Sequence, residues 1–268
     1  MKLLNAKFLI LTVFMSVIGT DVMAYDLTVN GMYFNFWNGE ELEVTFGNNY
    51  GTAYYWGNIE IPKTVEWNGA TFSVTKIGTM AFGNCSGLKS VTIPNSIVSI
   101  GSNAFQKCSS LTSITIPSST KTLDGNIFVG CTSLASIVVD AENNVYDSRE
   151  NCNAIIRTSS NELCFGCKNT TIPSSVQSIW GGAFSGCTGL TAIEIPNNVT
   201  TIGARAFYGC TGLTSISLPL GITEIENSTF KGCTGLTSIN LPLDVTSIGE
   251  YNQEIEGETN VEIIPVSA

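Results

Sequence analysis

The chain has 268 residues, which is long enough for one large domain or for an array of repeats. It carries 22 acidic and 12 basic residues, and a surface with this net charge of −10 repels phosphate backbones, which argues against nucleic-acid binding. The sequence contains no histidine, so Ser-His-Asp and Cys-His mechanisms are excluded and the commonest zinc and copper ligand is missing.

Residues 1–24 predict a signal peptide. Lys2 and Lys7 precede an apolar run at 8–18, and small residues up to Ala24 offer a cleavage site. The run is short for a bilayer-spanning helix, although an uncleaved membrane anchor is the alternative. We therefore expect an exported protein without a membrane span in the mature chain, held at the cell surface, released, or kept in the periplasm.

Residues 25–73 predict a small β-rich N-terminal cap that covers the first repeat of the array described below. The segment is rich in aromatic and turn residues, with Asn-Gly turns at 38–39 and 68–69. Its expected strands are 40–46, 57–61 and 70–74.

Three consecutive aromatic residues in this segment, Tyr54, Tyr55 and Trp56, cannot all face inward in one strand. We mark them as candidate contacts for a carbohydrate or protein ligand. The alternative is that they belong to the cap or to a turn.

A unit of 23 residues recurs between residues 74 and 250, and this self-similarity is typical of a solenoid. In one copy, Ile216 and Leu218 point to one side of an extended segment, and the intervening serine points to the other. Successive coils then stack their strands about 4.8 Å apart into a parallel sheet. The full copies are 93–115, 116–138, 172–194, 195–217 and 218–240.

The rest of each unit predicts short helical turns and loops on the other face of the coil. Ala206 and Phe207 fill the interior at one such turn, and Gly209 and Gly212 allow sharp bends beside it. The expected fold is a β-rich repeat solenoid in which each buried Phe, Leu or Ile contributes about 1.5–3 kcal/mol.

The stretch "IPNNVTTIGARAFYGCTGLTSI" (195–216) resembles the leucine-rich repeats, and most closely the bacterial BspA-type unit I-P-x-x-V-x-x-I-G-x-x-A-F-x-x-C-x-x-L-x-x-I. It matches that unit at every defined position, and the resemblance covers roughly residues 74–250. The resemblance implies an exported or surface-displayed protein that adheres to host proteins or other microbes. It implies a binding role without catalysis and without a cofactor.

In the leucine-rich repeats that this chain resembles, the strand face is the usual binding surface. Here its outward residues are small and mostly neutral, so simple solvation is the alternative interpretation. Trp180 is a large residue that replaces the usual glycine, and we mark it as a further candidate contact. The strand-face candidates are Thr115, Glu194, Ser215, Ser217 and Asn240.

Six cysteines share one position of the repeat: Cys85, Cys108, Cys131, Cys187, Cys210 and Cys233. We expect a structural ladder of small buried thiols near loop carbonyls, because free cysteine is among the most buried residue types. Disulfides between neighbouring coils are the alternative in an exported protein. A metal site is disfavoured, because equivalent residues form a line whereas zinc needs ligands around a point.

An irregular unit at 139–171 carries the other three cysteines. A turn at 158–161 predicts a hairpin with Arg157 opposite Glu162, Ile155 opposite Cys164, and Cys152 opposite Cys167. A Cys152–Cys167 disulfide is therefore one interpretation, and two buried thiols are the other. The Cys164-x-x-Cys167 spacing lacks the helix N-terminus and βαβ context of a redox motif.

These features favour a non-enzymatic surface protein that binds a protein or glycan, with no cofactor. A purely structural surface spacer is the main alternative, and a thiol-dependent redox protein is a weaker one. The tail at 251–268 breaks the repeat and is expected either to fray or to add one capping strand. The sequence does not indicate an oligomeric state.

Overall fold

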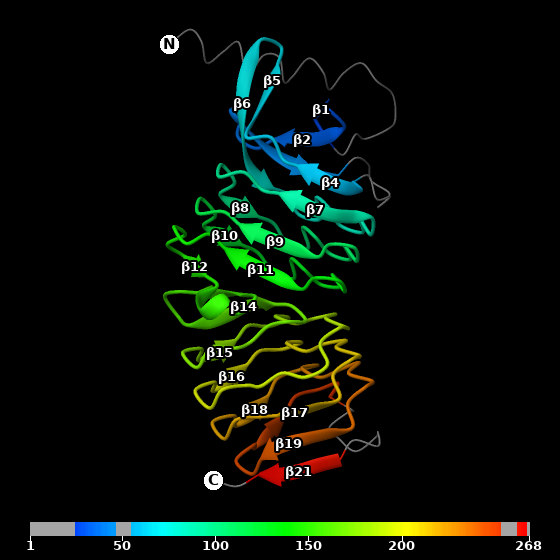
Figure 1. Ribbon diagram of the computed structural model, residues 1–268, viewed down its shortest axis with the longest axis vertical. Coiled ribbons are helices and arrows are strands. Elements are labelled where there is room, and N and C mark those ends of the chain that lie inside the picture. The colour runs from blue at the N-terminus through cyan, green and yellow to red at the C-terminus, as the bar shows by residue number, and fades with distance from the viewer. Residues whose placement is uncertain (1–24, 47–54, 253–261, 267–268) are drawn as a thin grey trace.

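The computed structural model describes residues 25–46, 55–252 and 262–266, so the predicted signal peptide lies outside it. The chain winds into coils that stack along one direction into an elongated body (Figure 1), which confirms the predicted repeat solenoid. Each regular coil has three parts: a strand on the strand side, a short strand on the return side, and a turn segment that leads to the next coil. Within the described ranges, no helix has the length and hydrophobicity that crossing a bilayer requires.

The strand side carries parallel strands whose inward residues are apolar. Equivalent residues pair in register at intervals of one repeat, as Ile114 does with Ile137 and Ile216 with Ile239. The strands are β7 (Leu88–Thr92), β9 (Ser113–Ile116), β11 (Ser136–Val139), β17 (Ser215–Ser217), β19 (Ser238–Pro242) and β21 (Glu262–Val266).

The return side carries two-residue strands, each with one exposed or half-buried residue followed by one apolar residue. They also pair in parallel, as Ile100 does with Ile77 and with Leu123. These strands are β8 (Ser99–Ile100), β10 (Thr122–Leu123), β15 (Ser178–Ile179), β16 (Thr201–Ile202), β18 (Glu224–Ile225) and β20 (Ser247–Ile248).

The turn segment is a run of hydrogen-bonded turns rather than a helix. The amides of residues 206, 208 and 210 donate to carbonyls three residues earlier, at 3.0–3.1 Å. The amides of residues 205, 207 and 209 donate instead to carbonyls of the following coil, at 2.8–3.1 Å. Because every second amide is used between coils, the segment cannot close into a regular helix, which would use its amides internally.

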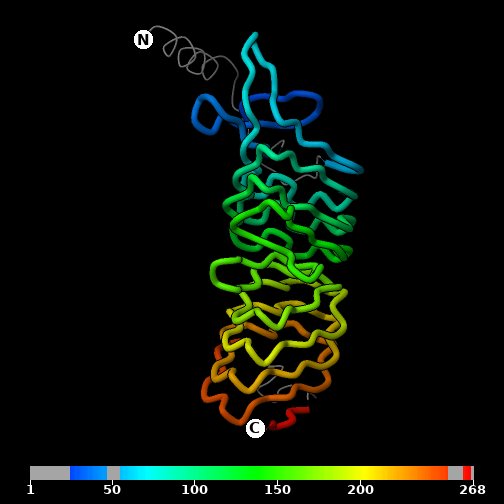
Figure 2. Tube along the Cα trace, turned by 60° about the vertical axis from the view of Figure 1, so that its left-hand side comes forward, coloured from blue at the N-terminus to red at the C-terminus, as the bar shows by residue number. Residues whose placement is uncertain are grey.

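The N-terminal strands continue both sheets of the solenoid. On the return side β3 pairs in parallel with β6, and β6 with β8; on the strand side β4 pairs with β7. The predicted boundary between residues 73 and 74 falls inside β6, whose first half forms a hairpin with β5 that projects from the end of the stack (Figure 2). The strands are β1 (Leu27–Val29), β2 (Met32–Phe36), β3 (Glu41–Thr45), β4 (Gly57–Glu60), β5 (Thr64–Trp67) and β6 (Ala70–Ile77).

Buried phenylalanines form two columns inside the solenoid. Phe105 stacks on Phe82 with ring centroids 5.1 Å apart, and Phe207 stacks on Phe184 at 5.2 Å and on Phe230 at 5.6 Å. The rings within these pairs lie within 8° of parallel, so each coil covers the ring of its neighbour. A single coil could not bury these rings alone.

The irregular unit separates the two columns. Its hairpin places Ile155 and Phe165 in the core of the preceding coils, whereas Ile156 and Leu163 belong to the core of the following coils. Ile155 and Ile156 are adjacent and point to opposite faces of β13, and a bulge in the pairing separates Leu163 from Phe165, so one hairpin closes both cores. Its elements are β12 (Tyr146–Asp147), the 3₁₀ turn η2 (Arg149–Asn151), β13 (Ala154–Arg157) and β14 (Glu162–Gly166).

The predicted hairpin register is only partly correct. Arg157 lies opposite Glu162, as expected, but a β-bulge shifts the pairing so that Ile155 lies opposite Phe165 rather than Cys164. The predicted facing of Cys152 and Cys167 rested on the unshifted register and loses that support, since Ala154 lies opposite Gly166. The bulge turns the bulky Phe165 ring into the first core, where it meets Phe128 edge-on at 5.8 Å.

We predict that Phe207→Ala lowers the free energy of unfolding by about 3–5 kcal/mol, because it removes a fully buried ring that is stacked on both sides. Urea denaturation followed by circular dichroism measures the change. The matched control is Tyr208→Ala, which removes the neighbouring, 40% exposed ring and should cost less than about 1 kcal/mol. Equal losses for the two variants would contradict the stacking argument.

Neighbouring coils approach closely at the turn formed by residues 211–213, and this gives a second prediction. A Cβ atom on Gly212 would lie 2.3 Å from the carbonyl oxygen of Thr188 in the preceding coil, whereas a Cβ on Gly125 would meet no atom within 4 Å. We expect Gly212→Ala to destabilise the protein by about 1–3 kcal/mol and Gly125→Ala to change stability by less than about 0.5 kcal/mol. Thermal melts of both variants test this, and a neutral Gly212→Ala would show that the coils can separate without cost.

Candidate functional site

The strand face, defined as the outward side chains of the strand-side strands, carries mostly small polar groups on three separate sheets, with the exposed Val138 among them. Parallel pairing aligns Thr115 with Val138, Ser215 with Ser238, and Ser217 with Asn240. Of the predicted contacts, Thr115, Glu194, Ser215 and Ser217 are exposed, and Asn240 is partly buried with its amide 3.5 Å from the Ser217 hydroxyl. The structure therefore brings these candidates onto one surface.

Strand β4 extends this face by one row that the sequence interpretation missed. Asn58 pairs with Ser90, whose hydroxyl donates to the Asn58 side-chain oxygen at 2.8 Å, and Glu60 pairs with Thr92. The signal was present in the sequence, because Ile61 and Pro62 repeat the Ile-Pro start of the regular unit. The β5–β6 hairpin follows β4 directly and interrupts the repeat, so this unit was not recognised from the sequence.

Trp56 stands at the beginning of the extended row. Its side chain is 73% exposed, and it lies directly before β4, where the next residue donates its amide to the Gly87 carbonyl at 2.8 Å. An exposed tryptophan beside a row of small side chains is the kind of residue that dominates binding energy in protein interfaces. Of the two consecutive aromatics that the structure describes, Tyr55 and Trp56, it is Trp56 whose placement fits a contact role.

Tyr55 is a core residue rather than a surface contact, which corrects the prediction for it. Its side chain is 3% exposed, its ring lies 4.8 Å from that of Phe82, and its hydroxyl donates to the Thr45 carbonyl at 2.8 Å. Burial raises its pKa well above the ordinary tyrosine value. Tyr54 lies outside the described residues.

Trp180 is also packed into the structure rather than presented to a ligand. It is partly buried, and its ring meets the edge of Phe165 at 5.5 Å, with the Arg157 guanidinium 6.0 Å from the ring centre. At the equivalent position of the next coil, a Cβ on Gly203 would lie 2.6 Å from the backbone of Gly181. Trp180 therefore packs against the first core beside the hairpin and is removed from the candidate surface.

The ladder cysteines have a structural contact that the repeat predicts. The thiols of Cys108, Cys131, Cys210 and Cys233 donate to the carbonyl of the phenylalanine one coil earlier, at 2.9–3.2 Å. They therefore lie along a line through the stack. In the part of the chain that the structure describes, no three or more Cys, Asp or Glu side chains are arranged to hold a metal ion.

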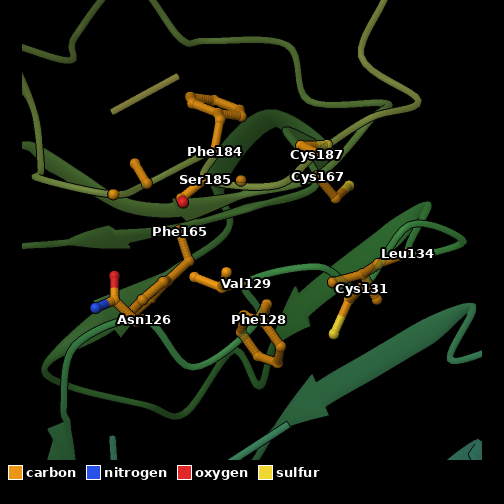
Figure 3. A pocket seen from close by; sticks show the side chains of 13 residues that line it. Asn126, Phe128, Val129, Cys131, Leu134, Phe165, Cys167, Phe184, Ser185 and Cys187 are labelled. Carbon is orange, nitrogen blue, oxygen red and sulfur yellow. The ribbon is translucent and has the colours of Figure 1, made fainter. Parts of the chain in front are cut away.

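The regular line of ladder cysteines is interrupted at the irregular unit. Cys187 is partly exposed and, together with Cys131 and Cys167, lines a cavity of about 10 Å³ between the two cores, as Figure 3 shows. Burial, reinforced by the neighbouring thiols, raises the pKa of Cys187 to about 12. This volume holds about one water molecule, so the three thiols do not form a substrate pocket.

The hairpin thiols are likewise unsuited to nucleophilic chemistry. Burial raises the pKa of Cys152 and of Cys164 to about 11, and that of Cys167 in the same direction. The Cys167 thiol donates to the Asn153 carbonyl at 3.3 Å, and both Cys152 and Cys167 are free thiols here. The proposed Cys152–Cys167 disulfide stays a prediction, without the register that first suggested it.

Comparison with known proteins places this arrangement in context. A family model described as a BspA type leucine rich repeat region matches residues 58–160 and 154–256, in six copies. Among curated proteins, none matches the chain.

Several solved structures are also similar to this chain. A leucine rich cell surface protein from Faecalibacterium prausnitzii is 20% identical over 90% of this chain and 95% of that chain, with a TM-score of 0.43. A leucine rich repeat protein from T. pallidum is 26% identical over 84% and 86%, with a TM-score of 0.44. One from Eubacterium ventriosum is 16% identical over 93% and 86%, with a TM-score of 0.46.

We predict slow alkylation of the hairpin thiols in the native, reduced protein. A pKa of about 11 leaves roughly one thiol in a thousand ionised at pH 8, so Cys152 and Cys164 should react with iodoacetamide at least about 100-fold more slowly than free cysteine. Their rates should rise with pH through pH 10, since only the thiolate reacts. Mass spectrometry of quenched samples measures the rates, with urea-unfolded protein as control; fast native labelling would support the redox alternative.

Proposed function

Because the chain belongs to the BspA-type leucine-rich repeat family, we propose that it is an exported or cell-surface protein that binds an extracellular protein on its strand face. The observation that carries the proposal is the 73% exposed Trp56 beside the small, mostly polar side chains of the strand face. The role is adhesin-like and non-catalytic. The absence of histidine and the raised pKa values of the hairpin thiols support the non-catalytic part.

The shape and chemistry of the strand face favour a protein over a small ligand. Small-molecule sites are concave pockets, whereas this face presents small side chains, mostly with hydroxyl or amide groups, on short parallel strands. Its hydroxyls and amides can hydrogen-bond with an opposing surface, and Trp56 supplies a large apolar anchor at one end. We place the centre of the interface near Thr115, between the β4–β7 pair and β11.

The strand-face proposal predicts a sharp difference between two exposed threonines of the same coil. Thr115 lies on β9 on the strand side, and Thr122 lies on β10 on the return side. With extracellular-matrix proteins immobilised for surface plasmon resonance, Thr115→Arg and Trp56→Ala should each weaken saturable binding by about 30-fold, as expected for an interface hot spot.

The controls are Thr122→Arg and Trp37→Ala, which should leave the dissociation constant within about twofold. Trp37 is also an exposed tryptophan, at 56%, but it is covered on one side by the Lys76 ammonium 3.1 Å from its ring centre. Equal losses in test and control variants would refute the strand face as the site. If none of the immobilised extracellular-matrix proteins shows saturable binding, the structural-spacer alternative is favoured.

A further inference from the structure

A hollow of about 570 Å³ lies on the turn side of the last coils, away from the strand face. Its volume is in the range of sites that hold one or two sugar rings or a similar small molecule. It is lined by Arg205, Tyr208, Ser228, Lys231 and Tyr251.

The repeat itself aligns these residues. Arg205, Ser228 and Tyr251 occupy one position of successive units, all with left-handed backbone at φ between 57° and 63°. The amide of Arg205 donates to the Asn227 carbonyl at 3.1 Å, and that of Ser228 donates to the Glu250 carbonyl at 2.8 Å. The backbones of successive coils are therefore hydrogen-bonded to each other at this position. Tyr208 and Lys231 likewise occupy a second shared position.

The side chains in these rows differ from those of the earlier coils. At the first position the earlier coils carry Met80, Asn103, Asn126 and Gly182, and at the second Gly83, Gln106, Val129 and Ser185. Aromatic and basic residues therefore gather at these positions only where the hollow lies. Arg205, Tyr208 and Tyr251 are exposed at these positions, whereas Ser228 is buried, so the first three side chains are available to a ligand.

The charge of the hollow is also unusual for this protein. The chain has 12 basic residues against 22 acidic ones, yet two cations line this hollow. Among the residues that the structure describes, neither Arg205 nor Lys231 has an ion-pair partner, while the Lys231 ammonium lies 4.6 Å from the centre of the Tyr251 ring. Tyr208 and Tyr251 are 40% and 53% exposed, so both rings are accessible.

We propose that this hollow binds an acidic sugar unit, carboxylated or sulfated, at a site separate from the strand face. The Arg205 guanidinium presents paired donors that suit a carboxylate or sulfate group, and Lys231 adds a second positive charge. The exposed tyrosine rings offer flat apolar surfaces for the C–H face of a sugar ring. A long polyanion such as nucleic acid would be repelled by the net charge of −10, whereas a short acidic oligosaccharide carries little charge beyond the hollow.

Isothermal titration of the purified protein with a trisaccharide of galacturonic acid tests the proposal, with the neutral galactose trisaccharide as the paired ligand. We expect saturable binding of the acidic sugar that is at least about tenfold tighter than that of the neutral one. A sulfated disaccharide serves as a second acidic probe, and binding of either acidic probe supports the site. Failure of both at millimolar concentration overturns it, as does equal affinity for the neutral sugar.

Substitutions in the hollow, compared with a control substitution elsewhere, test where the acidic sugar binds. Lys231→Gln, Arg205→Gln and Tyr251→Ala should each weaken it by about tenfold, whereas Lys121→Gln, which changes the net charge equally but lies on the return side, should leave it unchanged. Equal loss with Lys121→Gln would indicate a general charge effect and refute the site. Inorganic sulfate that binds as tightly as the acidic sugars would reduce the hollow to a simple anion site and overturn the sugar assignment.

The strand-face variant Thr115→Arg keeps this test independent of the proposed function. It should leave acidic-sugar binding intact, and the turn-side variants should leave protein binding intact. Either site can therefore fail without the other, and loss of sugar binding in Thr115→Arg would refute the separation of the two sites.

Discussion

The structure depends on the contact between one coil and the next. A coil of 23 residues buries its phenylalanine only when a neighbouring ring covers it, and every second amide of its turn segment finds an acceptor only in the adjacent coil. The ladder thiols complete the same contact by donating to the phenylalanine carbonyl of the previous coil. Cysteine suits this position because it is small, apolar and able to donate one weak hydrogen bond. These requirements occupy the inside of the coil and leave the outward positions free to vary.

That division explains where function can reside. The strand face and the turn-side hollow are both built from residues that the stack does not need, set on a backbone that the stack holds rigid. Neighbouring rows are fixed by strand and turn pairing, so side chains from different coils meet at regular spacing without any flexible loop between them. A ligand that bridges several rows would be recognised by a pre-organised surface, which lowers the entropic cost of binding.

The sequence alone predicted the features that recur and missed those that occur once. The 23-residue period, the parallel strands and the ladder of buried thiols near loop carbonyls all follow from residues such as Ile216, Phe207 and Cys210, whose surroundings are repeated. The bulge beside Cys164 was missed because it depends on which core Phe165 must reach. Trp180 was assigned to the surface because its packing against Phe165 of the hairpin cannot be seen from a single position. The sequence could not say which of the consecutive aromatics is buried, and the structure shows that Tyr55 is buried and Trp56 is exposed.

The hairpin of the irregular unit has a consequence for cooperativity. By turning Phe165 toward one core and Leu163 toward the other, it ends one run of nearest-neighbour contacts and begins a second. In a quasi-one-dimensional array, such a boundary divides the molecule into two folding units that are joined through the hairpin itself. The first unit carries Trp56 and the second carries the turn-side hollow, so damage that melts one block leaves the other able to remain folded.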